Sequence, residues 1–197
     1  LARAEADDFS LDLDVVDLNV VARGAVEAWA EPARRAEVLL EARTPAHPVM
    51  AVADPARARQ VVDALLSNAV RVTPAGRPVI VAALTLPDAT PALQVRDGGP
   101  GLADDDLPVA FDQGVLRDRY EGVRPGGSGL GLALVERLTR RMGGTVSAEH
   151  APEGLHHGEG PEGPPHRVGR RRVPPRPDGA VGRSWPLVRR SARRAGS

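Results

Sequence analysis

The chain changes its composition near residue 151, and this change limits the part of the chain that can fold. Residues 151–197 hold 8 Pro and 8 Gly, with 10 Arg against 4 acidic residues and few scattered apolar side chains. Such a segment buries too little apolar surface to offset the entropy that it would lose on ordering. We therefore expect one folded domain within residues 1–150, followed by a disordered tail rich in Pro, Gly and Arg.

The composition of the whole chain excludes several classes of protein. Cysteine is absent, so disulfides and thiolate metal sites are excluded. The chain has neither an apolar run of about 18 residues nor a secretory leader, so we expect no membrane contact and a cytoplasmic location. Because it starts at Leu1 rather than at Met, we expect it to belong to a longer protein, whose other parts could be anchored in the inner membrane.

The spacing of apolar residues predicts the elements of the first part of the domain. A helix begins near Leu18 and keeps apolar residues at helical spacing as far as Trp29, and Pro32 is expected to end it. Two β-type runs follow at residues 37–42 and 49–53, with a turn-forming stretch between them. The sequence thus predicts a helix followed by a β-hairpin.

The rest of the domain has a clearer pattern. Asp54 suits the N-cap, and Pro55 the first position, of a helix that extends to about Val72. The elements expected after it are an antiparallel pair of strands at 79–86 and 92–97, a lid-like loop at 98–128, a helix at 130–142 and a strand at 145–150.

The helix at 54–72 carries polar side chains on one face. Gln60, Ala64, Asn68 and Arg71 follow one another at spacings of four, four and three residues, beside the apolar stripe. An amide oxygen such as that of Asn68 is a hard ligand that suits Mg²⁺, and the planar fork of Arg71 suits phosphate. The alternative is that both residues only form the solvated side of an amphipathic helix.

Two glycine-rich segments follow. At Asp97–Gly101 a carboxylate leaves a strand end beside glycines, which suits the amine and the ring face of a purine, although a simple turn is the alternative. At Gly126–Gly131 glycines lead into a helix N-terminus, whose free N–H groups suit phosphates. This second segment is no P-loop, because the chain has no Lys, and no dinucleotide fingerprint, because Leu132 stands where the third Gly is needed.

Together and in this order, the three segments resemble the N, G1 and G2 boxes of the ATP-binding family that includes histidine kinases, DNA gyrase B subunits, heat-shock protein 90 and MutL proteins. Leu65–Ala69, with Arg71 and Thr73, resembles the histidine-kinase N box. Asp97–Gly101 resembles the DxGxG motif, and Gly127–Leu134 resembles the GxGxGLxL loop. The chain is therefore similar to the ATP-binding catalytic domain of bacterial sensor histidine kinases.

This resemblance implies a fold and a division of the chain. The fold is an α+β two-layer sandwich, the Bergerat ATP-binding fold, in which helices cover one face of a mixed β-sheet. Residues 1–16 would be the end of a dimerisation helix and a linker, residues 17–150 the ATP-binding domain, and residues 151–197 the tail. Phe111 stands where the family has its F box.

The resemblance also implies ATP and Mg²⁺ as cofactors and gives roles to single residues. Asn68 is expected to bind Mg²⁺ and, with Arg71, to act at the reacting phosphate, whereas Asp97 is expected to bind the adenine amine. The glycine loop is expected around the triphosphate. The expected cofactor-binding residues are Asn68, Arg71, Asp97, Gly99, Gly101, Gly127, Ser128, Gly129, Leu130 and Gly131.

One position separates the kinases of the family from its ATPases. Gyrase-like ATPases have a Glu four residues before the Asn as a general base, and here that position holds Ala64. Transfer of the γ-phosphate to a histidine needs no such base, so the resemblance implies a protein histidine kinase of a two-component signal transduction system. Departures from the family pattern at Ala64, Val72, Gly98 and Gly114 leave the alternative of a nucleotide-binding regulator without phosphotransfer activity.

The phosphoacceptor is expected outside this chain. His47 and the four histidines at or beyond residue 150 lack the acceptor pattern of the family. The acceptor would lie on a dimerisation domain in cis or on a partner chain, a response regulator would act downstream, and the isolated fragment is expected to be inactive. No final strand of the family pattern follows Gly154, so the tail is interpreted as a shifted reading frame or an unusual replacement. The alternative is that the Arg-rich tail binds nucleic acid or an acidic partner through phosphate contacts. With Trp185 as its single aromatic residue and without a folded motif, no nucleic-acid partner is expected.

Overall fold

The computed structural model describes residues 10–115, 130–150 and 187–192. The strands are β1 (Asp14–Asp17), β2 (Leu39–Arg43), β3 (Met50–Ala53), β4 (Pro78–Thr85), β5 (Pro91–Arg96), β6 (Thr145–His150) and β7 (Leu187–Ala192). The helices are α1 (Leu18–Arg35), α2 (Pro55–Val72) and α4 (Leu130–Arg141), with a short 3-10 helix η1 (Asp104–Asp106) before α4. These bounds confirm the predicted helix after Asp54, the helix from Leu130 and the strand from Thr145.

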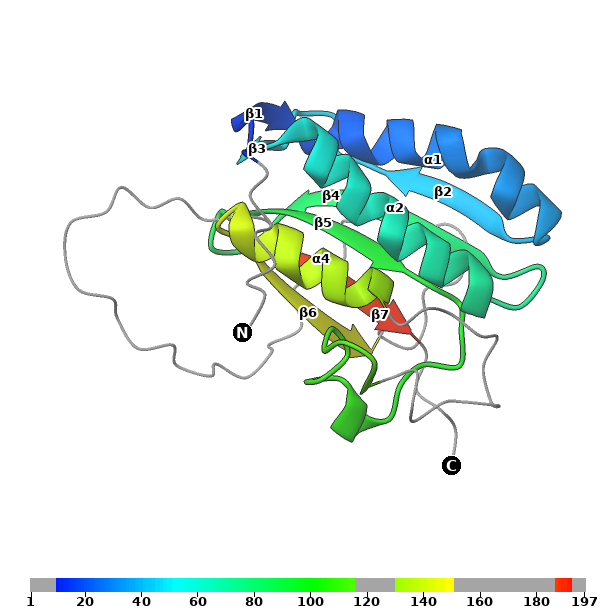
Figure 1. Cartoon of the computed structure of the whole chain (residues 1–197). Coiled ribbons are helices and arrows are strands. Elements are labelled where there is room, and N and C mark those ends of the chain that lie inside the picture. The colour runs from blue at the N-terminus through cyan, green and yellow to red at the C-terminus, as the bar shows by residue number, and fades with distance from the viewer. Residues whose placement is uncertain (1–9, 116–129, 151–186, 193–197) are drawn as a thin grey trace.

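The helices α1, α2 and α4 cover one face of a five-stranded sheet (Figure 1). The strand order is β2-β4-β5-β7-β6, and β4 pairs antiparallel with β5, as predicted. The other neighbours, β2 with β4 and β7 with both β5 and β6, pair in parallel. The sheet is therefore mixed, and the predicted α+β sandwich is confirmed.

The two runs that were predicted to form a hairpin belong to different sheets. Strand β2 joins β4 in the large sheet, whereas β3 pairs antiparallel with β1 in a separate two-stranded sheet. The connection between them is held at the start of α1, where Asn19 Nδ2 donates to the carbonyl of His47 (2.8 Å) and Asp17 Oδ1 accepts from the N–H of Val49 (3.2 Å). The hairpin prediction is wrong because these contacts direct β3 toward β1. Strand β1 begins at Asp14, so it overlaps the last residues of the linker predicted at 1–16.

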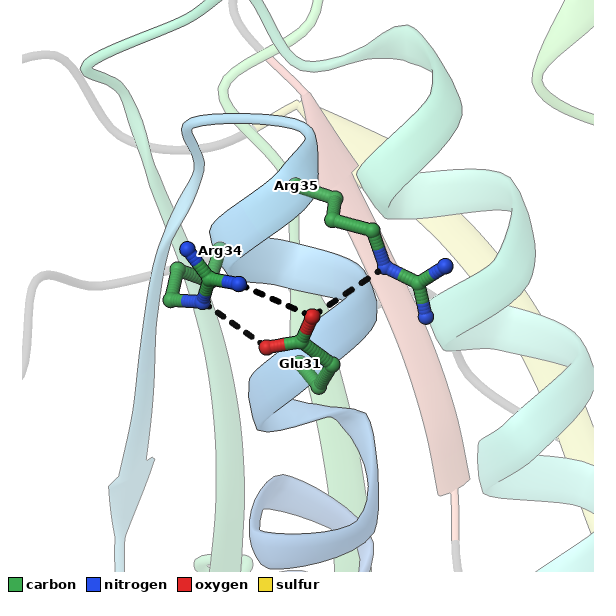
Figure 2. A network of polar contacts seen from close by, with 3 residues as sticks. All are labelled: Glu31, Arg34 and Arg35. Atoms are coloured by element: carbon green, nitrogen blue, oxygen red, sulfur yellow. Dashed lines mark hydrogen bonds and ion pairs between the residues drawn. The ribbon is translucent and has the colours of Figure 1, made fainter.

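Helix α1 continues for a turn beyond Pro32, where the sequence predicted its end. Proline removes one N–H donor and disfavours the helical conformation of the residue before it. In this turn Glu31 binds the side chain of Arg34 (2.8 Å) and that of Arg35 (3.4 Å), as Figure 2 shows. The contact with Glu31 raises the pKa of the Arg34 guanidinium. Both arginines also lie at the negative end of the helix dipole, so the last turn forms despite the proline.

The core lies between the helices and the sheet. The apolar stripe of α2 supplies Leu65 and Leu66, which are 2% and 0% exposed, and α4 supplies Val135 and Leu138. They pack with the inward-facing residues of the sheet, among them Val79, Val81, Leu93 and Val95. Truncating a buried leucine of this kind to alanine costs about 2–5 kcal/mol, so this packing fixes the position of α2 over the sheet.

A strand within the predicted tail corrects one expectation. Residues 187–192 form β7, which lies between β5 and β6 and pairs with both, for example Val95 with Arg190 and Val146 with Val188. Backbone pairing depends little on side chains, and it satisfies backbone groups on the facing edges of β5 and β6. The expectation of a disordered tail over residues 151–197 is therefore wrong at residues 187–192. Residues 151–186 and 193–197 lie outside the described residues.

Asp54 fixes the start of α2 through both of its carboxylate oxygens. Oδ1 accepts from the N–H of Arg57 (3.0 Å) and Oδ2 from the N–H of Asp12 (3.1 Å). Burial acts to raise the pKa of the Asp54 carboxyl, but the backbone N–H groups of Arg57, Asp12 and Ala56 and the charge of Arg57 together lower it below its ordinary value. A lowered pKa in the folded state means that the ionised form stabilises the fold.

We predict that Asp54→Ala lowers the free energy of unfolding by about 1 kcal/mol at pH 7, the usual cost of losing an N-cap. The stabilisation by the carboxylate is complete above its unfolded pKa of about 3.9 and is lost as the pH falls through the lower folded value. Urea denaturation of wild type and variant at pH 7 and at pH 3 measures the loss in free energy of unfolding at each pH. Asp105→Ala, at an exposed position, is the control. An equal loss at both pH values would contradict a role for the charge.

Candidate nucleotide site

Three segments with ligand-binding chemistry meet at one end of the sandwich, as Figure 1 shows. Helix α2 ends there at Val72, strand β5 ends there just before Asp97, and helix α4 starts there at Leu130. Helix α2 also packs against both β5 and α4. We call this end of the molecule the α2/β5/α4 corner. The polar face of α2, the segment after β5 and the first turn of α4 therefore lie at one place.

Asn68 and Arg71 lie in the last two turns of α2 and contact each other. Arg71 is exposed, and its NH2 atom donates to Oδ1 of the half-buried Asn68 (2.8 Å). The Nδ2 atom of Asn68 is buried, and no described residue accepts a hydrogen bond from it. One turn earlier Ala64 packs against the hydrophobic core, so this position supplies no acid or base. The corner thus holds an amide oxygen and a cation but no general base at position 64.

Asp97 is a buried carboxylate directly after the C-terminal end of β5. It is 6% exposed, and its Oδ1 accepts from the backbone N–H of Gly99 (3.0 Å). A Cβ atom at position 99 would lie 2.9 Å from this oxygen, 2.9 Å from Val72 Cγ2 and 3.0 Å from the Val72 carbonyl oxygen. Gly101 has a φ of 79°, in the left-handed region that favours glycine. The backbone conformation around Asp97 therefore requires glycine at both position 99 and position 101.

Thr73 ties the end of α2 to the segment after β5. Its hydroxyl accepts from the N–H of Gly98 (3.2 Å), and the residue is only 7% exposed. A Cβ atom at position 98 would lie 2.9 Å from the Cβ of Arg77, so the close approach of these two segments favours glycine there. From the sequence, Thr73 was predicted only to be part of the N box. A threonine directly after a predicted helix end was the available signal for this link.

The glycine loop is described only in part. Gly127, Ser128 and Gly129 lie outside the described residues, and so does the side chain of Leu130. The backbone of Leu130 begins α4, and Gly131 follows in its first turn, where a Cβ built on it would meet no described atom within 4 Å. A helix N-terminus carries free N–H groups and a partial positive charge that favour anions. The first turn of α4 therefore adds anion-binding chemistry to the corner.

The described part of the predicted lid is anchored to the domain. Leu102, Ala110 and Phe111 are buried in the core. Asp104 in η1 lies 2.7 Å from Nε2 of His150 at the end of β6. Residues 98–115 are therefore packed against the domain. The rest of the predicted lid, residues 116–128, lies outside the described residues.

The donor set of the corner fits Mg²⁺ only together with further ligands. In the described part of the chain, no three His, Asp or Glu side chains gather to hold a metal ion. Mg²⁺ commonly binds proteins through one or two oxygen ligands and takes its other ligands from water and phosphates. The oxygen of Asn68, beside a cation and a helix N-terminus that suit phosphate, matches this pattern.

Comparison with known proteins gives the class of the domain. The sequence model of the family of histidine kinase-, DNA gyrase B- and HSP90-like ATPases matches residues 53–162, which are more than half of the chain. This chain belongs to that family. A Mycobacterium tuberculosis relative, the sensor histidine kinase component HK1, is 42% identical over 101 residues, covering 51% of this chain and 57% of the relative. The chain thus spans less than two thirds of that relative.

Solved structures agree with this class. Full-length ShkA in complex with AMPPNP is 30% identical with a TM-score of 0.58, covering 68% of this chain and 27% of that one. The ATP-binding domain of PrrB from Mycobacterium tuberculosis is 26% identical with a TM-score of 0.55, covering 73% and 90% of the two chains. Within the family, this chain is an ATP-binding catalytic domain of the sensor histidine kinase type. None of its described helices is long and apolar enough to cross a lipid bilayer.

We predict that Gly99→Ala weakens ATP binding at least tenfold, because the new Cβ meets the Val72 backbone and the Asp97 carboxylate, and neither can move without moving the corner. Gly24→Ala in helix α1 is the matched control, since a Cβ there lies 3.9 Å from the Arg59 side chain, an ordinary contact outside the corner, and alanine favours a helix. Isothermal titration calorimetry measures both affinities. Unchanged binding by Gly99→Ala would show that this backbone takes no part in the site.

Proposed function

We propose that this chain binds ATP with Mg²⁺ at the α2/β5/α4 corner and transfers the γ-phosphate to a histidine of a dimerisation domain that another part of the protein or a partner chain supplies. The observation that carries the proposal is the buried Asp97 carboxylate, held by Gly99 against the end of the helix that bears Asn68 and Arg71. The family match and the AMPPNP complex of ShkA support it.

Asp97 would recognise the adenine base. A carboxylate offers about four acceptor sites, one of which Asp97 uses for the N–H of Gly99, and the exocyclic amine of adenine would donate to another. The residue is buried, and a polar contact made away from water discriminates strongly against ligands that cannot form it. The glycines beside it leave the ring face of the base open to close approach by the backbone. This chemistry favours adenine over a base with a carbonyl at the same position.

Asn68, Arg71 and the first turn of α4 would hold the phosphates. The Arg71 guanidinium can bind phosphate oxygens with two parallel hydrogen bonds, and the N–H groups at the start of α4 add further donors. Asn68 would ligate Mg²⁺, which when bound neutralises charge on the phosphates. These groups orient the γ-phosphorus toward an incoming nucleophile, and positioning of this kind accounts for most phosphoryl-transfer catalysis.

The nucleophile would be an imidazole nitrogen rather than water. A neutral imidazole has a lone pair and needs no base, so Ala64 does not hinder the attack. The new bond joins this nitrogen to the γ-phosphorus, the bond to the bridging oxygen breaks, and ADP leaves. A response regulator would then accept the phosphoryl group, and the reaction would take place in the cytoplasm.

A regulator without phosphotransfer activity is the second candidate. Val72 is the residue that favours this alternative. Its side chain packs against Gly99, whereas the family resemblance implies an aromatic side chain at this position, beside the adenine base. Loss of stacking costs about 1–3 kcal/mol of binding free energy for an aromatic–base contact. Such a domain would bind ATP weakly and phosphorylate no histidine.

We predict that Asp97→Asn weakens ATP binding by about ten- to a hundredfold, the usual value of a hydrogen bond to a charged group. Asp105→Asn makes the same charge change at an exposed position and should leave the affinity unchanged. Calorimetry with and without Mg²⁺ measures both variants. Equal affinities of Asp97→Asn and wild type would refute the assignment of Asp97 to adenine.

We further predict that the chain phosphorylates a purified, histidine-bearing dimerisation domain of a sensor kinase when given ATP and Mg²⁺, and that Asn68→Ala abolishes the transfer. Radiolabelled γ-phosphate, retained in base and lost in acid as expected of phosphohistidine, provides the measurement. ATP binding without any labelled histidine, tested against several such domains, would favour the regulator instead.

A further inference from the structure

The contact between Arg71 and Asn68 occupies the atom that the proposed function assigns to Mg²⁺. A guanidinium can only donate, so it meets the oxygen of the amide and not its nitrogen. The Nη2 atom of Arg71 therefore fixes Asn68 with Oδ1 toward the exposed guanidinium (2.8 Å), while the buried Nδ2 has no hydrogen-bond partner among the residues that the structure describes. Within the described ranges, the oxygen is thus the one atom of this side chain that is hydrogen-bonded.

This oxygen cannot serve both cations equally well. A magnesium ion binds an oxygen ligand at about 2.0–2.1 Å, so a guanidinium hydrogen-bonded to the same oxygen would lie within a few ångströms of the ion. Like charges so close repel strongly, especially at a half-buried position. Binding of a free metal ion to Asn68 therefore requires that Arg71 first leave.

Arg71 is free to leave when an anion attracts it. Its side chain is exposed, and within the described part of the chain its hydrogen bond to Asn68 is its one recorded polar contact, with no carboxylate paired to it. By contrast Arg34 and Arg59 are held by Glu31 and Asp63. A phosphate offers Arg71 two charged acceptors in place of one neutral oxygen, which is the stronger contact.

We propose that Arg71 is an interlock that keeps Asn68 from binding a divalent cation until a nucleotide phosphate draws the guanidinium away. The proposal rests on the proposed function and adds an order of binding to it. The nucleotide phosphate binds first, and its binding frees Asn68 to bind the metal ion. Asn68 then regains a lone pair, and its unpartnered Nδ2 leaves the amide free to turn toward the cation. Arg71 is in this respect a positioning residue that couples the two ligands.

The test measures metal affinity directly, with Mn²⁺ as a paramagnetic probe followed by electron paramagnetic resonance on the full 197-residue chain. Arg71→Met keeps a long side chain without charge or donors, and Arg71→Lys keeps the charge without the fork. We expect Arg71→Met to bind Mn²⁺ roughly tenfold more tightly than wild type without nucleotide, because the repulsion is gone. Arg71→Lys should stay near wild type.

The wild-type chain gives a second measurement that needs no variant. Addition of ADP should strengthen its Mn²⁺ binding more than tenfold, and Arg71→Met should lose most of this gain. Because ADP itself binds Mn²⁺, Asn68→Ala with ADP provides the background. An Mn²⁺ affinity of Arg71→Met equal to or weaker than that of wild type, without nucleotide, would overturn the interlock. Failure of wild type to bind any adenine nucleotide would instead overturn the proposed function, and the interlock with it.

Discussion

The site depends on the close contact between the end of α2 and the glycine segment after β5. Gly98 donates to Thr73, and the backbone at Gly99 approaches Val72 so closely that no side chain fits between them. This contact places the polar face of a helix beside a buried carboxylate at the C-terminal end of the central strand β5. Without it, each half of the site would be an ordinary amphipathic helix or an ordinary turn.

The rest of the fold keeps that contact in place. Asp54 anchors the start of α2, buried leucines hold its middle on the sheet, and α4 packs along its side. Because both ends of the helix are fixed, its last two turns have little freedom, and Asn68 and Arg71 emerge at a defined place. A backbone that is held in place in this way loses less entropy when its side chains bind a ligand.

Sequence reasoning predicted what local signals determine and missed what tertiary contacts determine. The cap at Asp54, the strand pair before Asp97 and the glycine after α4 at Gly143 were all readable from the residues nearby. The partner of β3, the turn beyond Pro32 and the pairing of β7 depend on distant groups and could not be read in this way. In the site, the motif order predicted which segments matter, whereas the bonds of Thr73 to Gly98 and of Arg71 to Asn68 required coordinates.

The central claim is that one corner of this domain binds an adenine nucleotide. The most direct test is a ¹H–¹⁵N correlation spectrum of the labelled chain during titration with AMPPNP and Mg²⁺. Our account predicts large shifts for the backbone of Asn68, Asp97, Gly99 and Gly131, and unchanged signals for β1 and β3 at the other end of α2. Shifts confined to that other end, or none at saturating nucleotide, would contradict it.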